Sequence, residues 1–136
     1  MSGLFHVSAR DHGALVFMSM LARAERDVFL SLQYVADEMH LSQGYLEEVA
    51  ASLKKAKLIE GKQGPAGGYR LTRPAGEISM EDILTAIEGP LELVDCQSKG
   101  ALCPVQGKCS SKRMLDALQR TIRTSLQQTT LAALME

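Results

Sequence analysis

The sequence lacks any long apolar run. Its 136 residues contain no stretch near the roughly eighteen that a membrane-spanning helix needs, and its first residues do not combine a basic segment, an apolar segment and a small-residue cleavage site. It also lacks a glycine-rich phosphate loop, a nucleophile motif and, outside the segment that holds the cysteines, a cluster of His, Asp and Glu. We therefore expect a cytoplasmic protein that contacts no membrane and is not an enzyme.

Net charge is also nearly absent, but the charges are unevenly distributed. The formal net charge is -1. Residues 54–73 contain six basic side chains and one acidic side chain, whereas residues 74–98 contain six acidic side chains and no Lys or Arg. Because phosphates are neutralised by local cations rather than by a basic average, this pattern is compatible with one edge that binds a polyanion. An ordinary solvated surface explains the same pattern equally well.

The order of the expected elements is that of a winged helix-turn-helix. A capping-box-like start at Ser8 predicts a first helix over about residues 8–25. Ser31 and Ser42 are expected to cap two further helices, the second of which extends to about residue 57, with a tight turn between them. Two strands, at 58–62 and 69–72, flank a glycine-containing turn. The predicted fold class is mainly α with a small β-hairpin wing.

Apolar residues at helical spacing predict which faces of these helices are buried. The expected stripe of the first helix consists of Leu15, Met18, Leu21 and Ala22. The expected stripe of the third helix consists of Leu46, Val49, Ala50 and Leu53. This arrangement leaves the polar face of the third helix available to a partner.

The remaining chain predicts a fourth helix, a loop and a long helix. Ser79 is expected to cap a helix that ends at Gly89, residues 89–110 show no period, and apolar positions recur over about 110–129. A long amphipathic helix beyond a compact domain usually packs on a copy of itself; the alternative is that it packs on its own domain. We divide the chain into a winged-helix domain (1–88), a loop that contains the cysteines (89–110), and a long helix with a short C-terminal helix (111–136).

All three cysteines of the chain, Cys96, Cys103 and Cys109, lie in this loop. Their odd number and the expected reducing compartment argue against a disulfide framework. Thiolates are soft ligands that suit iron–sulfur clusters and zinc, but the C-x6-C-x5-C spacing matches neither the paired knuckles of structural zinc nor standard ferredoxin runs. Iron–sulfur binding, zinc binding and free thiols all remain open on the spacing alone.

Three segments together resemble the Rrf2 family of winged-helix transcription regulators. They are residues 41–47 (LSQGYLE), residues 64–71 (GPAGGYRL) and the three-cysteine loop. The likeness extends from about Val7 to the terminal residues 130–134. It implies a cytoplasmic homodimer built on the long C-terminal helix, and a double-stranded DNA operator with near two-fold symmetry.

The resemblance also implies where DNA is contacted. The third helix would enter the major groove and the wing would reach the minor groove. The residues that match the family's DNA-contacting segments, together with the lysines that could meet phosphates, are Ser42, Gln43, Tyr45, Glu47, Lys54, Lys62, Gln63, Gly64, Gly67 and Gly68. One departure is Gln63, which stands where many members carry an arginine suited to a narrow minor groove.

For the cysteines, the resemblance implies an iron–sulfur cluster, [2Fe-2S] or [4Fe-4S], held by Cys96, Cys103 and Cys109. The fourth ligand varies within the family. Lys112 stands where the iron–sulfur biogenesis regulator has a histidine, whereas His12 matches the position that supplies a ligand from the other subunit in the nitric-oxide sensor. We therefore predict His12, with Asp11 as a weaker alternative.

The expected function is sequence-specific transcription regulation that senses redox state, nitric oxide or iron–sulfur status. The alternatives are a winged-helix regulator with structural zinc, or one whose thiols react without metal.

Overall fold

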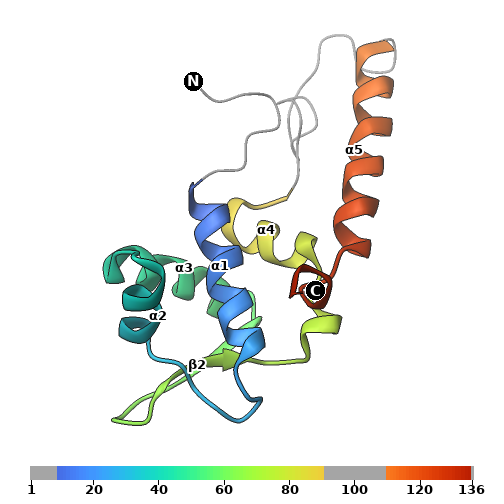
Figure 1. Cartoon of the computed structure of the whole chain (residues 1–136). Helices are drawn as coiled ribbons and strands as arrows, with labels where there is room; N and C mark the ends of the chain where they lie inside the picture. Colours follow the sequence, from blue (N-terminus) through green and yellow to red (C-terminus); the bar gives the residue numbers. More distant parts are fainter. Residues whose placement is uncertain (1–8, 91–109, 136) are drawn as a thin grey trace.

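The computed structural model describes residues 9–90 and 110–135. Its helices are α1 (Ala9–Arg23), α2 (Leu32–Met39), α3 (Gln43–Lys55), α4 (Met80–Glu88) and α5 (Ser110–Gln128). Two strands, β1 (Ile59–Lys62) and β2 (Gly68–Leu71), follow α3, and short 3-10 turns occupy Ala75–Glu77 and Ala132–Met135. The helices α1 to α4 gather around one core above the hairpin, whereas α5 extends away from them (Figure 1). This confirms the predicted mainly α fold with a hairpin wing.

Side-chain caps fix the starts of three helices. The Ser31 hydroxyl accepts a hydrogen bond from the backbone N–H of Tyr34, and the Ser42 hydroxyl accepts one from that of Tyr45. At α4, Ser79 and Asp82 form a reciprocal capping box. Each cap satisfies N–H groups that have no partner within the helix. The three capping predictions are confirmed, whereas the predicted cap of α1, Ser8, lies outside the described residues.

The core lies between α1, α3 and α4. The predicted stripe of α3 is confirmed, because all four of its members are fully buried. The stripe predicted for α1 is partly wrong: Met18 and Leu21 are buried, but Ala14 and Phe17 complete the buried face while Leu15 and Ala22 pack at its edge. Residues 14–18 of α1 are all apolar, so the spacing alone does not define one face.

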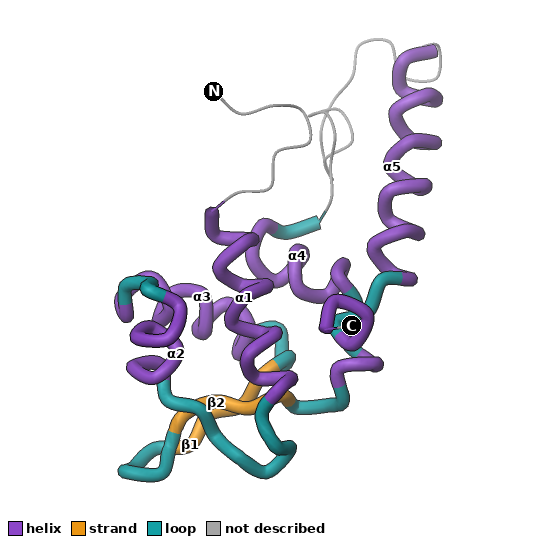
Figure 2. Tube along the Cα trace, in the orientation of Figure 1, coloured by secondary structure: helices purple, strands orange, loops and turns teal. Residues whose placement is uncertain are grey.

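The wing is an antiparallel hairpin extended by one residue of the α1–α2 loop. β1 and β2 lie side by side at the hairpin (Figure 2). Ile59 pairs with Leu71, and Lys62 pairs with Gly68. Leu30 pairs with Tyr69 on the other side of β2, through N–H···O distances of 2.9 and 2.8 Å. Gly68 is required there, because a Cβ at its position would overlap the backbone of Leu30. The loop before α2 is therefore attached to the base of the wing.

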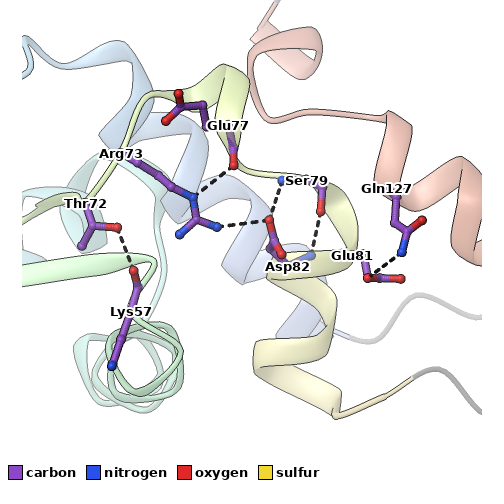
Figure 3. A network of polar contacts seen from close by, with 8 residues as sticks. All are labelled: Lys57, Thr72, Arg73, Glu77, Ser79, Glu81, Asp82 and Gln127. Atoms are coloured by element: carbon purple, nitrogen blue, oxygen red, sulfur yellow. Dashed lines mark hydrogen bonds and ion pairs between the residues drawn. The ribbon is translucent and has the colours of Figure 1, made fainter.

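Polar contacts connect the wing to α4 and α5 (Figure 3). Arg73, directly after β2, donates to the carbonyl oxygen of Glu77 at 3.0 Å and to a carboxylate oxygen of Asp82 at 3.2 Å. Glu81 on α4 accepts from Gln127 on α5 at 3.2 Å and lies 3.5 Å from Arg123. The wing, α4 and the C-terminal half of α5 thus belong to one connected framework.

The segment after α5 returns to the core. Leu131 is fully buried, its N–H donates to the carbonyl oxygen of Ile78 at 2.8 Å, and the N–H of Met80 donates to Thr129 at 2.8 Å. The C-terminal end of α5 is therefore anchored on α4. No helix among the described residues is both long and apolar enough to cross a membrane.

Candidate DNA-binding surface and metal ligands

The first turns of α3 present polar groups to solvent. Ser42, Gln43 and Glu47 are exposed, and Lys54 lies further along the helix, also exposed. Residues 43, 47 and 54 lie on one side of α3, because their spacings of four and seven residues correspond to one and two helical turns. The apolar side of α3, with Leu46 and Val49, is buried in the core. α3 is therefore held by its apolar side while its polar side remains available to a partner.

Tyr45 lies differently from its polar neighbours on α3. Its side chain is half-buried, and its hydroxyl lies so close to Gly13 of α1 that a Cβ on Gly13 would overlap it. Burial raises the pKa of the Tyr45 hydroxyl, while a hydrogen bond with the Gly13 backbone and the nearby charge of Arg10 act in the opposite direction. Tyr45 thus connects the start of α3 to the first turns of α1.

The wing turn contains residues of two kinds. Lys62, Gln63 and Gly64 are exposed at the tip, and the N–H of Gly67 closes the turn on the carbonyl oxygen of Gly64 at 2.9 Å. Gly64 has a φ of +106°, which glycine adopts without strain. Gly67 and Gly68 are half-buried, and a Cβ on Gly68 would overlap the Leu30 backbone. Gly64 and Gly68 therefore shape the wing and give it no side chain for recognition.

The basic segment divides into paired arginines and exposed lysines. Arg70 lies 2.6 Å from Glu60 and 3.7 Å from Asp27, and Arg73 pairs with Asp82. The exposed lysines are Lys54, Lys55, Lys57 and Lys62, and within residues 9–90 and 110–135 the structure shows no ion pair for any of them. These four lysines are the cations that the segment offers to a polyanion.

The three cysteines, Cys96, Cys103 and Cys109, lie outside the described residues. Within the described residues, no group of three or more His, Cys, Asp or Glu side chains is placed to hold a metal ion. His12 is exposed on the first turn of α1, whereas Asp11 beside it is buried, with 7% of its surface accessible. The exposed imidazole of His12 is accessible to a metal held by another part of the protein. The buried carboxylate of Asp11 is less accessible.

Lys112 does not have the surroundings of a metal ligand. Its ammonium lies 2.8 Å from the carboxylate of Asp116, one turn later on α5. A protonated lysine has no lone pair to donate to a metal. Of the candidate ligands in the part of the chain that the structure describes, His12 is thus the one with an exposed side chain that is not engaged in an ion pair shown by the structure.

α5 carries an exposed apolar surface. Met114 is 73% exposed and Leu118 is 40% exposed. The two residues are one turn apart and therefore lie on the same face of the helix. No side chain from residue 111 to 128 is fully buried. Charged residues such as Arg120 occupy the opposite face. Apolar side chains left open on one face of a long helix are typical of a helix that packs on a partner.

The contact between the α1–α2 loop and the wing was not predicted from the sequence. Phe29 and Leu30 contact the wing there, with the Phe29 ring centroid 4.5 Å from the Arg70 guanidinium. The apolar sequence Val28-Phe29-Leu30, bounded by charged residues and by Ser31, was the available signal for a short strand.

Comparisons with known proteins give concordant results. A family model named Rrf2 and described as an iron-dependent transcriptional regulator matches residues 7–136. NMA1593 of Neisseria meningitidis, named as an HTH-type transcriptional regulator, is 32% identical over 123 residues, which are 90% of this chain and 82% of that protein.

Two solved structures are similar over most of the chain. CymR (YrzC), described as the global cysteine regulator of B. subtilis, superposes with a TM-score of 0.76 at 27% identity and covers 95% of both chains. T. potens IscR superposes with a TM-score of 0.72 at 29% identity, over 95% of this chain and 85% of that one.

Proposed function

Because this chain belongs to the Rrf2 family of winged-helix transcription regulators, which are not enzymes, we propose that it binds operator DNA as a homodimer under the control of an iron–sulfur cluster. The observation that carries the DNA-binding part is the start of α3. It presents polar side chains to solvent on a helix that the core holds from the other side, next to a wing with an exposed lysine.

In this proposal α3 enters the major groove and the wing lies over the adjacent minor groove. Gln43 and Glu47 contact base edges, Ser42 lies at the phosphate backbone, and Lys54 and Lys62 neutralise phosphates. Gln63, Gly64, Gly67 and Gly68 form the wing turn that approaches the minor groove. Tyr45 fixes the start of α3 against α1, since its hydroxyl faces Gly13.

The dimer is proposed to form through α5. Met114 and Leu118 are the exposed apolar residues of this helix, and pairing two copies would remove them from water. Two copies related by a two-fold axis would present two recognition helices, so we expect an operator with near two-fold symmetry.

The cluster, [2Fe-2S] or [4Fe-4S], is proposed to be held by Cys96, Cys103 and Cys109 with His12 of the other subunit. Three soft thiolates and one imidazole form a donor set that suits iron, and His12 fits this role because its side chain is exposed. When bound, such a group supplies sensitivity to oxidation, nitric oxide or iron supply. The division into a DNA-binding domain (1–88), a cluster-binding loop (89–110) and a dimerisation segment (111–136) follows from these roles.

The described residues offer a route from the ligand to the DNA. His12 and Gly13 are neighbours on α1, and Gly13 contacts Tyr45 in the first turn of α3. A shift of the first turns of α1 would therefore move the start of the recognition helix. Dimer affinity depends steeply on the position of both recognition helices, because both half-sites must be met together.

Structural zinc and metal-free thiol chemistry remain the competing assignments for the cysteines. A colourless protein that contains zinc would favour the first. An iron-free protein whose DNA affinity still changes with oxidation would favour the second.

The DNA-binding part is tested by selecting bound sequences from a random duplex library with anaerobically purified protein. Wild type should select a sequence with near two-fold symmetry. Glu47→Ala should bind that sequence about 10- to 100-fold more weakly, as expected for one lost base contact per half-site. Thr124→Ala, exposed on α5, should bind like wild type. A wild type that selects no sequence, or equal effects of the two substitutions, would contradict the proposal.

A further inference from the structure

The side chain of Phe29 lies against two basic residues of the wing. The Arg70 guanidinium carbon is 4.5 Å from the centroid of the Phe29 ring, and the Lys62 ammonium nitrogen is 5.7 Å from it. Lys62 ends β1 and Arg70 lies in β2, whereas Phe29 belongs to the loop between α1 and α2. Cations within about 6 Å of an aromatic face are attracted to it electrostatically. The loop thus supplies a ring that both strands of the wing contact.

Phe29 is fixed relative to the wing by its backbone. Its neighbour Leu30 exchanges two hydrogen bonds with Tyr69, and Gly68 lies directly against the Leu30 backbone. Because Leu30 is hydrogen-bonded to β2, the position of the Phe29 backbone next to it is restricted, and the Phe29 ring stays close to the wing. The loop and the hairpin therefore behave as one unit.

The two cations that contact the ring differ in their other partners. Arg70 is paired with Glu60 at 2.6 Å and with Asp27 at 3.7 Å, so its charge is largely compensated. Lys62 is exposed, and among the described residues the structure shows no carboxylate paired with it. For Lys62 the Phe29 ring is thus the contact that restrains an otherwise uncompensated charge.

Phe29 and Lys62 line an open groove of about 550 Å³ between the start of α2 and the wing turn. Tyr34 of α2, half exposed, and Pro65 of the wing turn also line it. The groove adjoins the wing tip, so it is continuous with the surface proposed to meet DNA. The charged residues that line it are Lys62 and Asp27, and Asp27 lies 3.7 Å from the Arg70 guanidinium. Lys62 is therefore the cation of the groove lining that can meet a phosphate.

We propose that Phe29 is a positioning residue for DNA binding, which holds the Lys62 ammonium at this groove so that it meets a phosphate of the operator backbone. Lysine has a long flexible side chain, and ordering it on binding costs conformational entropy. The Phe29 ring restricts Lys62 before DNA arrives, so less ordering remains at the moment of binding. This inference rests on the proposed DNA-binding function.

The test is a double-mutant cycle on the full chain, with the selected duplex titrated over a range of salt concentrations. Phe29→Leu should weaken binding roughly two- to fivefold, the range expected for an exposed cation–ring contact. It should also lower the slope of log affinity against log salt toward the value of Lys62→Ala, for which we expect a decrease of about 1. Phe29→Tyr keeps a ring and should keep both wild-type values. The double variant should bind no more weakly than Lys62→Ala alone.

The matched control is Leu134→Ala, which removes an exposed apolar side chain that does not line the groove and should change neither affinity nor salt slope. Additive effects of Phe29→Leu and Lys62→Ala, or an unchanged salt slope in Phe29→Leu, would overturn the inference while DNA binding itself stands. Wild type that binds no duplex would remove both proposals.

A second measurement covers the case in which Phe29→Leu is poorly folded. In the free wild-type protein, the side-chain protons of Lys62 should show the upfield NMR shift produced by an aromatic ring, and Phe29→Tyr should retain it. Lys62 protons at random-coil shifts in wild type would overturn the inference.

Discussion

At the scale of single residues, the contact between Gly13 and Tyr45 decides how α1 meets α3. Tyr45 occupies the space beside Gly13 where any other residue would place a side chain. A glycine within a helix normally lowers stability, so its presence here is explained by the ring it admits. Local sequence rules could place Gly13 in a helix, but not predict this contact, which depends on packing between residues far apart in the chain.

Gly13→Ala is therefore expected to destabilise the protein by about 1–3 kcal/mol, the usual cost of overpacking, although alanine is the better helix former. The matched control is Gly44→Ala in α3, where a Cβ would meet nothing within 4 Å. That variant should be as stable as wild type or more stable. Urea unfolding measures both, and a shift of the two variants in the same direction would contradict the packing argument.

The half-buried Tyr45 side chain predicts a specific loss of stability in alkali. Its pKa in the folded protein lies above the usual value of 10.0, because burial disfavours the charged form. The unfolded chain therefore loses the Tyr45 proton at a lower pH than the folded protein does. The stability that the protonated hydroxyl contributes is fully present below pH 10.0 and is lost as the pH rises through the pKa of the folded protein.

Urea unfolding of wild type and Tyr45→Phe across this alkaline range tests the prediction. The free energy of unfolding of wild type should fall more steeply with pH than that of Tyr45→Phe. Tyr34→Phe, altered at an exposed site, should follow wild type. If the free energy of unfolding falls equally with pH in wild type and Tyr45→Phe, the pKa of the Tyr45 hydroxyl is not raised in the folded protein, and the prediction is wrong.

At the scale of elements, the helix starts were predictable and the wing was only partly so. Ser31, Ser42 and Ser79 act through hydrogen bonds to residues three positions later, which a local pattern contains. The pairing of Leu30 with Tyr69 joins residues far apart in sequence, so no local pattern predicts it. The family resemblance predicted that residues at the start of α3 contact DNA. Which of these side chains face solvent and which face α1 depends on how the helices pack, and the sequence pattern does not contain that information.

The exposed apolar face of α5 leads to a prediction about dimer formation. Leu118→Glu places a charge among the exposed apolar side chains of this helix, where it would be desolvated on pairing. We expect this variant to be monomeric at concentrations where wild type is a dimer, and to bind the operator at least tenfold more weakly. Arg120→Glu, on the opposite face, should remain dimeric. Analytical ultracentrifugation distinguishes the two outcomes, and a dimeric Leu118→Glu would place the interface elsewhere.

At the scale of the whole molecule, hydrogen bonds and packing connect α5 to the core of the winged helix. Leu131 is buried in the core, and Glu81 connects α4 to Gln127 and Arg123 of α5. In a dimer formed through α5, the spacing of the two recognition helices would therefore follow the orientation of α5. The same framework extends through Asp82 and Arg73 to the base of the wing.

The basic segment shows what charge counting could and could not predict. The cluster of cations between residues 54 and 73 was evident from the sequence, but two of its members, Arg70 and Arg73, are paired with carboxylates. Those pairs depend on the hairpin register and on the packing of α4, which composition does not contain. The cysteine segment lies outside the described residues, so Cys96, Cys103 and Cys109 stay predictions as ligands.

The central claim is that these cysteines hold an iron–sulfur cluster. It is tested most directly by anaerobic purification of wild type, Cys103→Ala and His12→Ala, followed by an absorption spectrum with iron and sulfide analysis. We expect a brown wild type that contains both elements, a Cys103→Ala variant that has lost them, and a His12→Ala variant with an altered or less stable cluster. A colourless wild type free of iron and sulfide would contradict it, and would leave the winged-helix regulator with zinc or thiol chemistry.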